Sequence, residues 1–338
     1  MAENLRKEWI LNVSREHPLK INSKRIEKIK AVLEELSGNR DVIIEVLENS
    51  FYLYRYLPIS LRGDLELALL AVERSGSNLE FVPTKMRSYR SLVFIAIKNG
   101  GSIRYLKENL RGDREIVLEA VKSDCNALEF ASDELKDDRE IVFTAVKENG
   151  FVLRYASEYL KNDEEIIIEG IKNNGYTMRF ASSDLKCNKE FILKAFKIAV
   201  SAKADNSSPL QEIHFICWDL RCDKEFILEA IKIDGGYFGG ASEKLRGDKQ
   251  VVIEAMKKQG YMFRAASEKL HNDKDFVLRA IRINATNGLR YASQSLKEDV
   301  EVVGEAFNYG GEYVLRHASK EMQEIFAKAI AQGKRLNL

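Results

Sequence analysis

A pattern of about 25 residues recurs along this chain, and this repetition limits the possible folds more than any other feature. Residues 128–150 (LEFASDELKDDREIVFTAVKENG) and 153–175 (LRYASEYLKNDEEIIIEGIKNNG) share the pattern, and residues 263–285 repeat it again. The shared pattern, with substitutions in individual copies, is Asp-x-Glu, a run of apolar residues and a Leu-Arg-aromatic-Ala-Ser segment. A fixed period of this length is typical of a solenoid built from short supersecondary units.

One position of the pattern, usually Asp or Asn, marks the start of each unit, and we call it the anchor. The anchors are spaced by 24 to 26 residues, except for ten extra residues before Asp223 and a last interval of 23 residues. About twelve units therefore extend from residue 39 to residue 330. The anchors are Asn39, Asp64, Tyr89, Asp113, Asp138, Asp163, Asn188, Asp223, Asp248, Asp273, Asp299 and the degenerate Met322.

Each unit is predicted to contain two short helices. The anchor is a favourable N-cap, because its side-chain oxygen can accept a hydrogen bond from an amide of the first turn. Apolar pairs spaced by four residues, such as Ile116–Val117 and Ala120–Val121, form one helical stripe. Pairs such as Asn149–Gly150 end this helix, and the glycine is expected to adopt the left-handed cap conformation. A shorter second helix is predicted to follow, as at residues 153–160.

Neither helix can stand alone. Helices of about 11 and 8 residues are too short to persist in water, so each unit needs its neighbours and stability is a sum over adjacent interfaces. A recurring alanine in the second helix is expected to allow close approach of the neighbouring helix. This column comprises Ala131, Ala156, Ala181, Ala241, Ala266, Ala292 and Ala318.

The sequence thus predicts an all-α, right-handed-type α-solenoid of about twelve two-helix repeats with an N-terminal helical cap. Residues 3–16 and 22–37 have the pattern of two longer amphipathic helices, separated by His17–Pro18. The boundaries that we expect are a cap at 1–38, a first solenoid half at 39–200, an inserted loop at 201–210, a second half at 211–330 and a tail at 331–338.

Composition narrows the class of protein further. The net charge of +1 and the 31% of charged residues suit a solvated helical surface and give no support for nucleic-acid binding by overall charge. No apolar run approaches the roughly 20 residues that a membrane span needs, and the charged N-terminus shows no secretory signal. Four cysteines without a CxxC pair are typical of a reduced protein, so we expect a cytoplasmic location.

The repeat resembles a known family. Leu-Arg-Tyr-Ala-Ser-x-x-Leu followed by Lys-Asn-Asp-x-Glu-Ile-Ile is similar to the tandem helical repeats catalogued as domain of unknown function 4116. The resemblance covers residues 39–330 and departs from the pattern at Tyr89, at 201–210 and at Gly239–Gly240. The family is found in intracellular bacteria, protists and large viruses. The resemblance therefore implies an α-solenoid without an assigned activity, and a possible secreted effector that acts in a host cytosol.

A search for catalytic and metal-binding residues leads to a negative prediction. Cys217 and Cys222 beside His214 could be taken for a metal cluster, but Cys187 and Cys222 share one repeat position, which favours a structural role. No Ser-His-Asp or Cys-His arrangement stands out from the repeat. We predict no enzymatic activity, no metal and no cofactor. The four histidines lie in different units: His17, His214, His271 and His317.

An arginine recurs once per unit in the second helix and forms the first candidate surface. One interpretation is that each arginine pairs with acids or carbonyls of an adjacent unit and fixes the stacking. The other is a cationic ridge for an acidic partner or for phosphate groups. Glu80 and Glu129 interrupt the column. The column comprises Arg55, Arg104, Arg154, Arg179, Arg264, Arg290 and Arg316.

The interruption of the repeat forms the second candidate surface. Trp218 takes a position that Glu, Asp or Ser holds in most units, so we expect an exposed apolar anchor beside His214. The next unit carries GGYFGG at 235–240, which removes two side chains and leaves Tyr237 and Phe238 as candidate contacts. A simple bend filled by Trp218 is the alternative, and a hinge between two solenoid halves is a third possibility.

These features favour a binding protein. The leading hypothesis is a non-catalytic, monomeric scaffold for a protein partner, because stacked helix pairs offer long surfaces for peptides or folded proteins. The alternative is RNA or phosphate-ligand binding through the arginine-aromatic column. The residues proposed to contact the partner are Trp218, His214, Tyr237, Phe238, Arg154, Arg179, Arg264 and Arg290.

Overall fold

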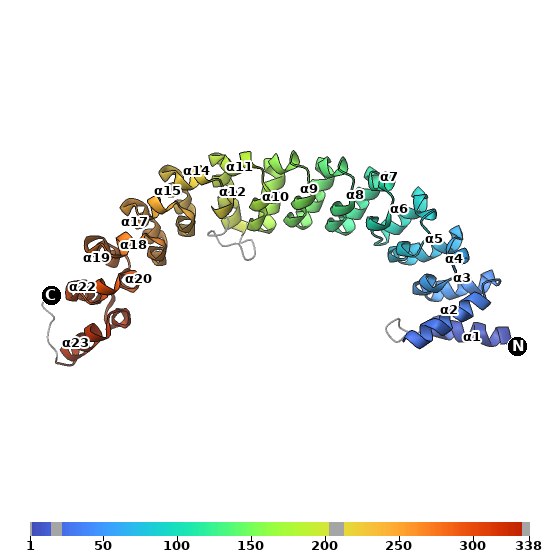
Figure 1. Ribbon diagram of the computed structural model, residues 1–338, viewed down its shortest axis with the longest axis horizontal. Coiled ribbons are helices and arrows are strands. Elements are labelled where there is room, and N and C mark those ends of the chain that lie inside the picture. The colour runs from blue at the N-terminus through green and yellow to red at the C-terminus, as the bar shows by residue number, and fades with distance from the viewer. Residues whose placement is uncertain (1, 15–21, 203–212, 333–338) are drawn as a thin grey trace. The chain divides into compact units, whose positions relative to one another are not determined.

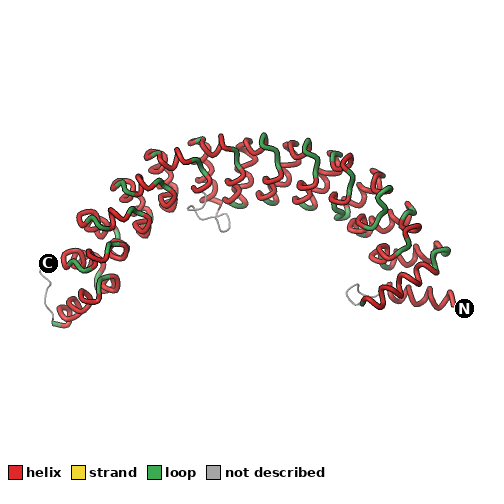
Figure 2. Tube along the Cα trace, viewed as in Figure 1, coloured by secondary structure: helices red, strands yellow, loops and turns green. Residues whose placement is uncertain are grey.

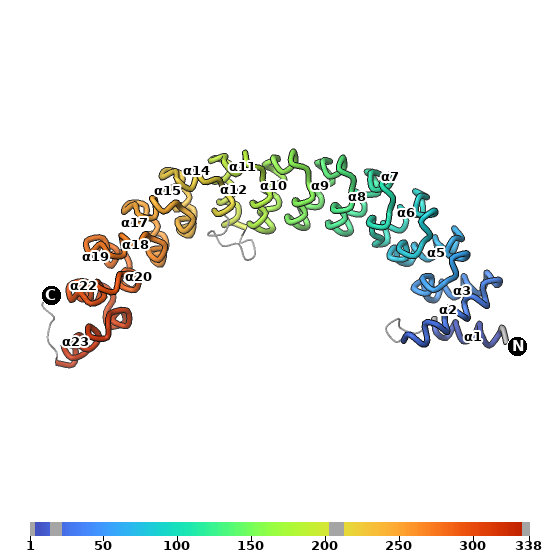
Figure 3. Tube along the Cα trace, in the orientation of Figure 1, coloured from blue at the N-terminus to red at the C-terminus, as the bar shows by residue number. Residues whose placement is uncertain are grey.

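The computed structural model describes residues 2–14, 22–202 and 213–332, which fold into α-helices and 3-10 helices without a strand (Figures 1 and 2). The all-α repeat fold predicted from the sequence is confirmed. The chain divides into two units, residues 1–160 and 161–338, and each is a stack of repeats coloured in chain order in Figure 3. Residues 17 and 18, most of the predicted loop 201–210 and the tail from residue 333 lie outside the described residues.

The first unit begins with two longer helices and continues with repeats. Its α-helices are α1 (Ala2–Ser14), α2 (Ser23–Glu35), α3 (Arg40–Asn49), α4 (Ile59–Arg62), α5 (Leu65–Arg74), α6 (Arg90–Lys98), α7 (Glu108–Arg111), α8 (Arg114–Ser123) and α9 (Arg139–Glu148). Its 3-10 helices are η2 (Phe51–Tyr56), η3 (Gly76–Glu80), η4 (Met86–Ser88), η5 (Ile103–Tyr105), η6 (Cys125–Phe130), η7 (Leu135–Asp137) and η8 (Gly150–Tyr155).

The second unit follows the 3-10 helix η9 (Leu160–Asn162), in which the division falls. Its α-helices are α10 (Glu164–Asn173), α11 (Ser183–Cys187), α12 (Lys189–Ala202), α14 (Trp218–Cys222), α15 (Lys224–Ile233), α16 (Glu243–Arg246), α17 (Lys249–Lys258), α18 (Glu268–His271), α19 (Lys274–Ile283), α20 (Ala285–Tyr291), α21 (Gln294–Lys297), α22 (Val300–Gly310) and α23 (Lys320–Ala331). Its 3-10 helices are η10 (Gly175–Phe180), η11 (Ile213–Phe215), η12 (Gly235–Gly240), η13 (Gly260–Ala265) and η14 (Glu312–His317).

The N-terminal helices cover the first repeat, as the sequence predicts. Helix α1 packs on α3, and the buried side chains of Ile10 and Leu33 close the end of the core. Arg6 forms an ion pair with Glu35 on α2 at 2.5 Å. The first repeat therefore does not expose its apolar face to water.

The repeat that begins at Asp113 shows how one unit is built. Asp113 caps α8 by accepting hydrogen bonds from the amides of Glu115 and Ile116 at 3.1 and 3.2 Å. The apolar pairs of the ten-residue helix are buried, as expected from their four-residue spacing. In each unit the long helices lie side by side in one row, and the 3-10 helices with the short α-helices form another (Figure 1).

The second helix differs from the prediction. It is a six-residue 3-10 helix, η8, which ends before Ala156, and a separate three-residue turn, η9, follows. Ala156 adopts an extended conformation (φ −67°, ψ 156°) and redirects the chain. The apolar spacing of 153–160 suits either arrangement, which is why the sequence did not distinguish them. The alanine column is 3 to 8% exposed, in agreement with the expected close packing.

Glycines at helix ends were expected to adopt the left-handed conformation, and this is confirmed at one helix end and wrong at two others. Gly100 has a positive φ of 82°, but Gly150 and Gly175 begin 3-10 helices and are not among the positive-φ glycines of the described chain. Asn149 precedes Gly150 in an extended conformation (φ −153°), and its side chain accepts a hydrogen bond from the amide of Phe151 at 3.0 Å. The asparagine thus caps the next helix, a role that the sequence analysis missed.

Candidate functional site

A recurring backbone hydrogen bond joins consecutive repeats. The amide of the residue that follows the small alanine, or Ile216 in one repeat, donates to the carbonyl of a basic residue in the preceding repeat, as in Ser132 to Arg111 at 3.0 Å. The pairs are Ser132–Arg111 and Ser157–Lys136 in the first unit, and Ser182–Lys161, Cys217–Lys186, Ser242–Arg221, Ser267–Arg246, Ser293–His271 and Ser319–Lys297 in the second. These backbone bonds hold the row of 3-10 helices in register.

The basic side chains at this position add further bonds to carbonyls. The guanidinium of Arg111 donates to the carbonyl of Arg104 at 2.7 Å, and Arg221 donates to Gly240 at 2.6 Å. In the second unit, Lys186 donates to the carbonyl of Arg179 at 2.7 Å. The contact with a carbonyl of an adjacent repeat, which one interpretation assigned to the arginine column, is made here by Arg221 of a different basic column, whereas Arg111 and Lys186 bond within their own repeats.

A second set of contacts between repeats, which we call the junction ladder, lies at the start of the long helices. The basic residue directly after an anchor reaches the anchor of the next repeat, as in Arg90 with Asp113 at 2.7 Å and Lys249 with Asp273 at 2.5 Å. The ladder cations are Arg40, Arg90 and Arg114 in the first unit and Lys224, Lys249 and Lys274 in the second. The sequence analysis overlooked this column, although a basic residue recurs there.

The ladder changes the proton affinity of the anchors. The hydrogen bond from Arg90 lowers the pKa of Asp113 below its ordinary value, against the opposing effect of burial. Lys249 does the same for Asp273, where it is the largest cause of the lowered pKa. For Asp138, burial alone would raise the pKa, but hydrogen bonds from Arg114 and from the helix amides lower it overall. The capping carboxylates are thus ionised and structural.

The predicted arginine column lies on the row of 3-10 helices and has a different environment. Arg154 and Arg179 are exposed, and each guanidinium stands over the aromatic ring of the following residue, at 4.6 Å from Tyr155 and 5.5 Å from Phe180. Arg290 lies 5.5 Å from the ring of Tyr291. Within the part of the chain that the structure describes, no carboxylate lies at ion-pair distance from these arginines or from the exposed Arg264. The column thus leaves its charge available to a ligand.

Trp218 and His214 lie where the repeat is interrupted. Trp218 is 58% exposed at the start of α14, and the guanidinium of Arg221 lies 4.9 Å from the centre of its ring. His214 is exposed on η11, and the side chain of Ile213 beside it is buried. The prediction of an exposed tryptophan is therefore correct, and an arginine supports the ring from one side.

The prediction that Tyr237 and Phe238 contact a partner is wrong. Both side chains are 0% exposed, and the Tyr237 ring stacks on Phe196 with centroids 3.8 Å apart. The glycines do not open a binding face either, because a Cβ on Gly240 would lie 2.0 Å from the side chain of Ile213. Close packing between η11 and η12 explains the missing side chain at Gly240, which the sequence alone could not show.

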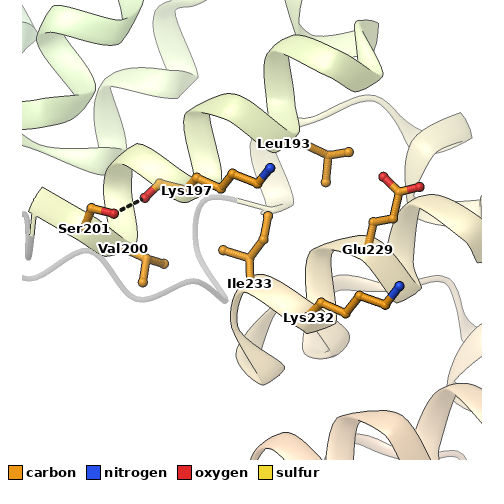
Figure 4. A pocket seen from close by; sticks show the side chains of 7 residues that line it. All are labelled: Leu193, Lys197, Val200, Ser201, Glu229, Lys232 and Ile233. Atoms are coloured by element: carbon orange, nitrogen blue, oxygen red, sulfur yellow. Dashed lines mark hydrogen bonds between the residues drawn. The ribbon is translucent and has the colours of Figure 1, made fainter.

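A groove on the row of long helices was not predicted (Figure 4). It lies between α12 and α15 and has a volume of about 480 Å³. Leu193, Val200 and Ile233 supply its apolar lining, and Lys197 and Lys232 place ammonium groups at its rim. Helix α12 has 14 residues where most repeats have ten, and this extension adds Val200, which is 40% exposed.

Within the described ranges, no group of three or more His, Cys, Asp or Glu side chains is placed to hold a metal ion. All four cysteines carry free thiols. No helix in the described part of the chain is both long enough and apolar enough to cross a membrane.

The repeats match one family model. The model described as a domain of unknown function, DUF4116, matches nine overlapping stretches of the chain. They are residues 39–87, 64–111, 89–136, 113–161, 138–185, 163–202, 223–271, 248–288 and 273–323. No curated protein and no solved structure matches the chain.

Proposed function

Since the chain belongs to the DUF4116 family, whose description assigns no activity, we propose from the geometry of the site that it is a non-catalytic binding scaffold for a protein partner. The proposed contact surface is the row of 3-10 helices and short α-helices. Repeats stacked side by side present equivalent side chains at regular intervals, which suits an extended partner. We propose no catalytic step and no cofactor.

The exposure of Trp218 is the observation that carries this proposal. A ring that is 58% exposed buries a large apolar area on binding, and tryptophan is enriched among residues that dominate binding energy. Equivalent positions hold Glu158 and Glu243, which are exposed and polar. The chain therefore replaces a solvated carboxylate by an apolar anchor at one place in the second unit.

The arginines indicate the charge of the partner. Arg179, Arg264 and Arg290 are exposed on the same row of the second unit, and no described carboxylate neutralises them. Guanidinium groups form paired hydrogen bonds with carboxylates, so an acidic segment with an apolar side chain is the partner that fits this surface. Arg154 offers the same chemistry in the first unit.

Trp218→Glu is the experiment that tests the proposal, because it restores the residue of the neighbouring repeats. Partners retained by the immobilised wild-type chain from a lysate are compared with those retained by the variant. Loss of a central aromatic contact should weaken retention at least about tenfold. Glu243→Ala at the equivalent position of the next repeat is the matched control and should leave retention unchanged.

Charge reversal of Arg154 and Arg179 gives an independent test. The double variant Arg154→Glu, Arg179→Glu should reduce partner retention while the melting temperature stays within about 1 °C of the wild type. A large loss of stability would show that the column holds the fold together. Retention that survives both this variant and Trp218→Glu would overturn the proposed surface.

RNA or phosphate binding is the second candidate, and the stacked guanidinium and aromatic groups favour it. A guanidinium group can bind phosphates, and an aromatic ring beside it can stack on bases. Glu80 and Glu129 interrupt the column in the first unit, and Tyr155 donates a hydrogen bond to Glu129 at 2.9 Å. Retention on heparin or RNA that falls steeply with salt would favour this function over the first.

A further part of the proposal concerns the location of the protein in the cell. We propose a cytoplasmic protein, located in the host cytosol if the chain acts as a secreted effector. A reporter fused to the chain and followed by cell fractionation separates the two cases. Recovery of the reporter only in the producing cell would exclude the effector role.

A further inference from the structure

Two junctions between repeats carry a side-chain hydrogen bond in addition to the backbone bond. The serine after the small alanine donates its hydroxyl to the residue that precedes the anchor of the previous repeat. Ser182 donates to Asn162 at 2.5 Å in the second unit, and Ser157 donates to Asp137 in the first. Two side chains from consecutive repeats are thus held in direct contact at this position.

At one junction of the second unit, both members of this pair are cysteines. Cys217 takes the serine position and Cys187 takes the position of Asn162. The amide of Cys217 donates to the carbonyl of Lys186 at 3.0 Å, the same backbone bond that Ser182 makes with Lys161 at 2.9 Å. The backbone of Cys217 is therefore tied to the peptide group that leads into Cys187.

The two cysteines occupy the positions whose side chains touch at the junction of Ser182 with Asn162, and both can be reached from solvent. A hydrogen bond between the side chains is the largest cause that raises the pKa of Cys187 to about 11. Cys187 is exposed and Cys217 is half-buried, so a small oxidant in solution can reach the pair. Cys222 repeats the position of Cys187 in the next repeat, but its counterpart is Ser242, and Cys125 lies in the first unit.

We propose that Cys187 and Cys217 form a redox-active dithiol that is converted to an intramolecular disulfide by glutathione disulfide. In the first step, one protein thiolate attacks glutathione disulfide, forms a mixed disulfide and releases glutathione. The second protein thiol then loses its proton and attacks the mixed disulfide, which releases a second glutathione. Two protein thiols lose two electrons, and the protons end on the two glutathione thiols.

Proximity favours the second step over competing reactions. A thiol held next to the mixed disulfide has a high effective concentration, so ring closure exceeds capture by free thiols in solution. The raised pKa of Cys187 keeps its thiolate fraction small at neutral pH, so oxidation should accelerate as the pH rises toward 9. The cross-link would join two repeats at positions thirty residues apart in the sequence.

The location connects the redox state to the proposed contact surface. Cys217 directly precedes Trp218, so the disulfide would fix the backbone that carries the exposed ring. Oxidation of Cys187 and Cys217 requires no protein partner, so it can be tested with the chain alone.

The test uses the full reduced chain incubated with glutathione disulfide, followed by acid quenching, alkylation and mass spectrometry. We expect two of the four thiols to resist alkylation, a loss of two hydrogen atoms and a peptide linking Cys187 to Cys217. This cross-link should exceed any other disulfide by about tenfold, because no other pair of thiols is held together.

Single substitutions distinguish the pair from general thiol reactivity. Cys217→Ser and Cys187→Asn restore the residues of the neighbouring junction and should abolish the cross-link, whereas Cys222→Ser and Cys125→Ser should leave it intact. In a Trp9→Phe background, the cross-link should also change the fluorescence of Trp218, the other tryptophan of the chain. Four thiols that remain alkylatable, stable glutathione adducts on single cysteines, or a cross-link through Cys222 would overturn the proposal.

Discussion

The junction ladder and the arginine column each place a basic residue in most repeats, and they differ in what their charges contact. Arg114 of the ladder forms an ion pair with Asp138 at 2.7 Å and also contacts Glu140 in the next repeat. Arg154 of the column lies over Tyr155 and has no carboxylate at ion-pair distance within the described ranges. A repeated residue is therefore not structural merely because it is repeated.

The difference separates two tasks that the same units perform. The ladder combines helix capping with contacts between repeats, so it contributes to stability. The column leaves charges exposed that the fold does not need, so its contribution should be to binding. Four predictions test this comparison, and they are ordered by the size of the expected effect on stability.

Acid should have the largest effect, because it acts on every ladder carboxylate at once. Each folded-state pKa lies below the unfolded value, so the stability is present above about pH 4 and is lost as the pH falls through the folded pKa. We expect the melting temperature to fall steeply between about pH 4 and pH 2, measured by circular dichroism. The anchors with lowered pKa are Asp64, Asp113, Asp138, Asp248, Asp273 and Asp299.

Replacing one anchor should have the next largest effect. Asp138→Ala removes the acceptor of two helix amides, those of Glu140 and Ile141, and one partner of Arg114. The expected loss is about 1 to 2 kcal/mol in the free energy of unfolding, measured by urea denaturation. Asp138→Asn is the control, because asparagine still caps the helix but cannot ionise. If both variants lost the same amount, capping would not explain the role of the anchor.

Removing a ladder cation should cost less. Arg114→Ala leaves the cap of α9 intact and removes only exposed ion pairs, so the melting temperature should fall by about 1 °C at low salt. The difference from the wild type should shrink at high salt, since solvent-exposed pairs are screened. A loss of stability as large as that of Asp138→Ala would show that the ladder cation, and not the cap, stabilises the contact between these two repeats.

The arginine column should contribute least to stability. Arg154→Ala removes an exposed guanidinium that lies over the Tyr155 ring at 4.6 Å. We expect the melting temperature to change by less than about 1 °C. Partner retention should nevertheless fall. An unfolding midpoint that drops as far as in Asp138→Ala would remove the distinction between the ladder and the column.

Much of the fold was determined by local sequence. The capping role of the anchors, the buried apolar pairs and the packed alanine column follow from local hydrogen bonding and from helical periodicity. The capping role of Asp113 and the close packing of Ala131 could be predicted without knowing which residues surround them, because every repeat places its neighbour in the same way. The exposure of Trp218 was also predictable, since the equivalent positions of other repeats hold polar residues.

Only the tertiary structure decided which repeated side chains meet. Arg90 reaches Asp113 because stacking brings two residues 23 positions apart together, and a linear pattern does not show which basic column does so. Tyr237 is buried because Phe196 covers it, and Cys187 meets Cys217 because their repeats are adjacent. Local patterns specify helices and caps through short-range bonds, whereas burial and pairing depend on the surface that the next repeat presents.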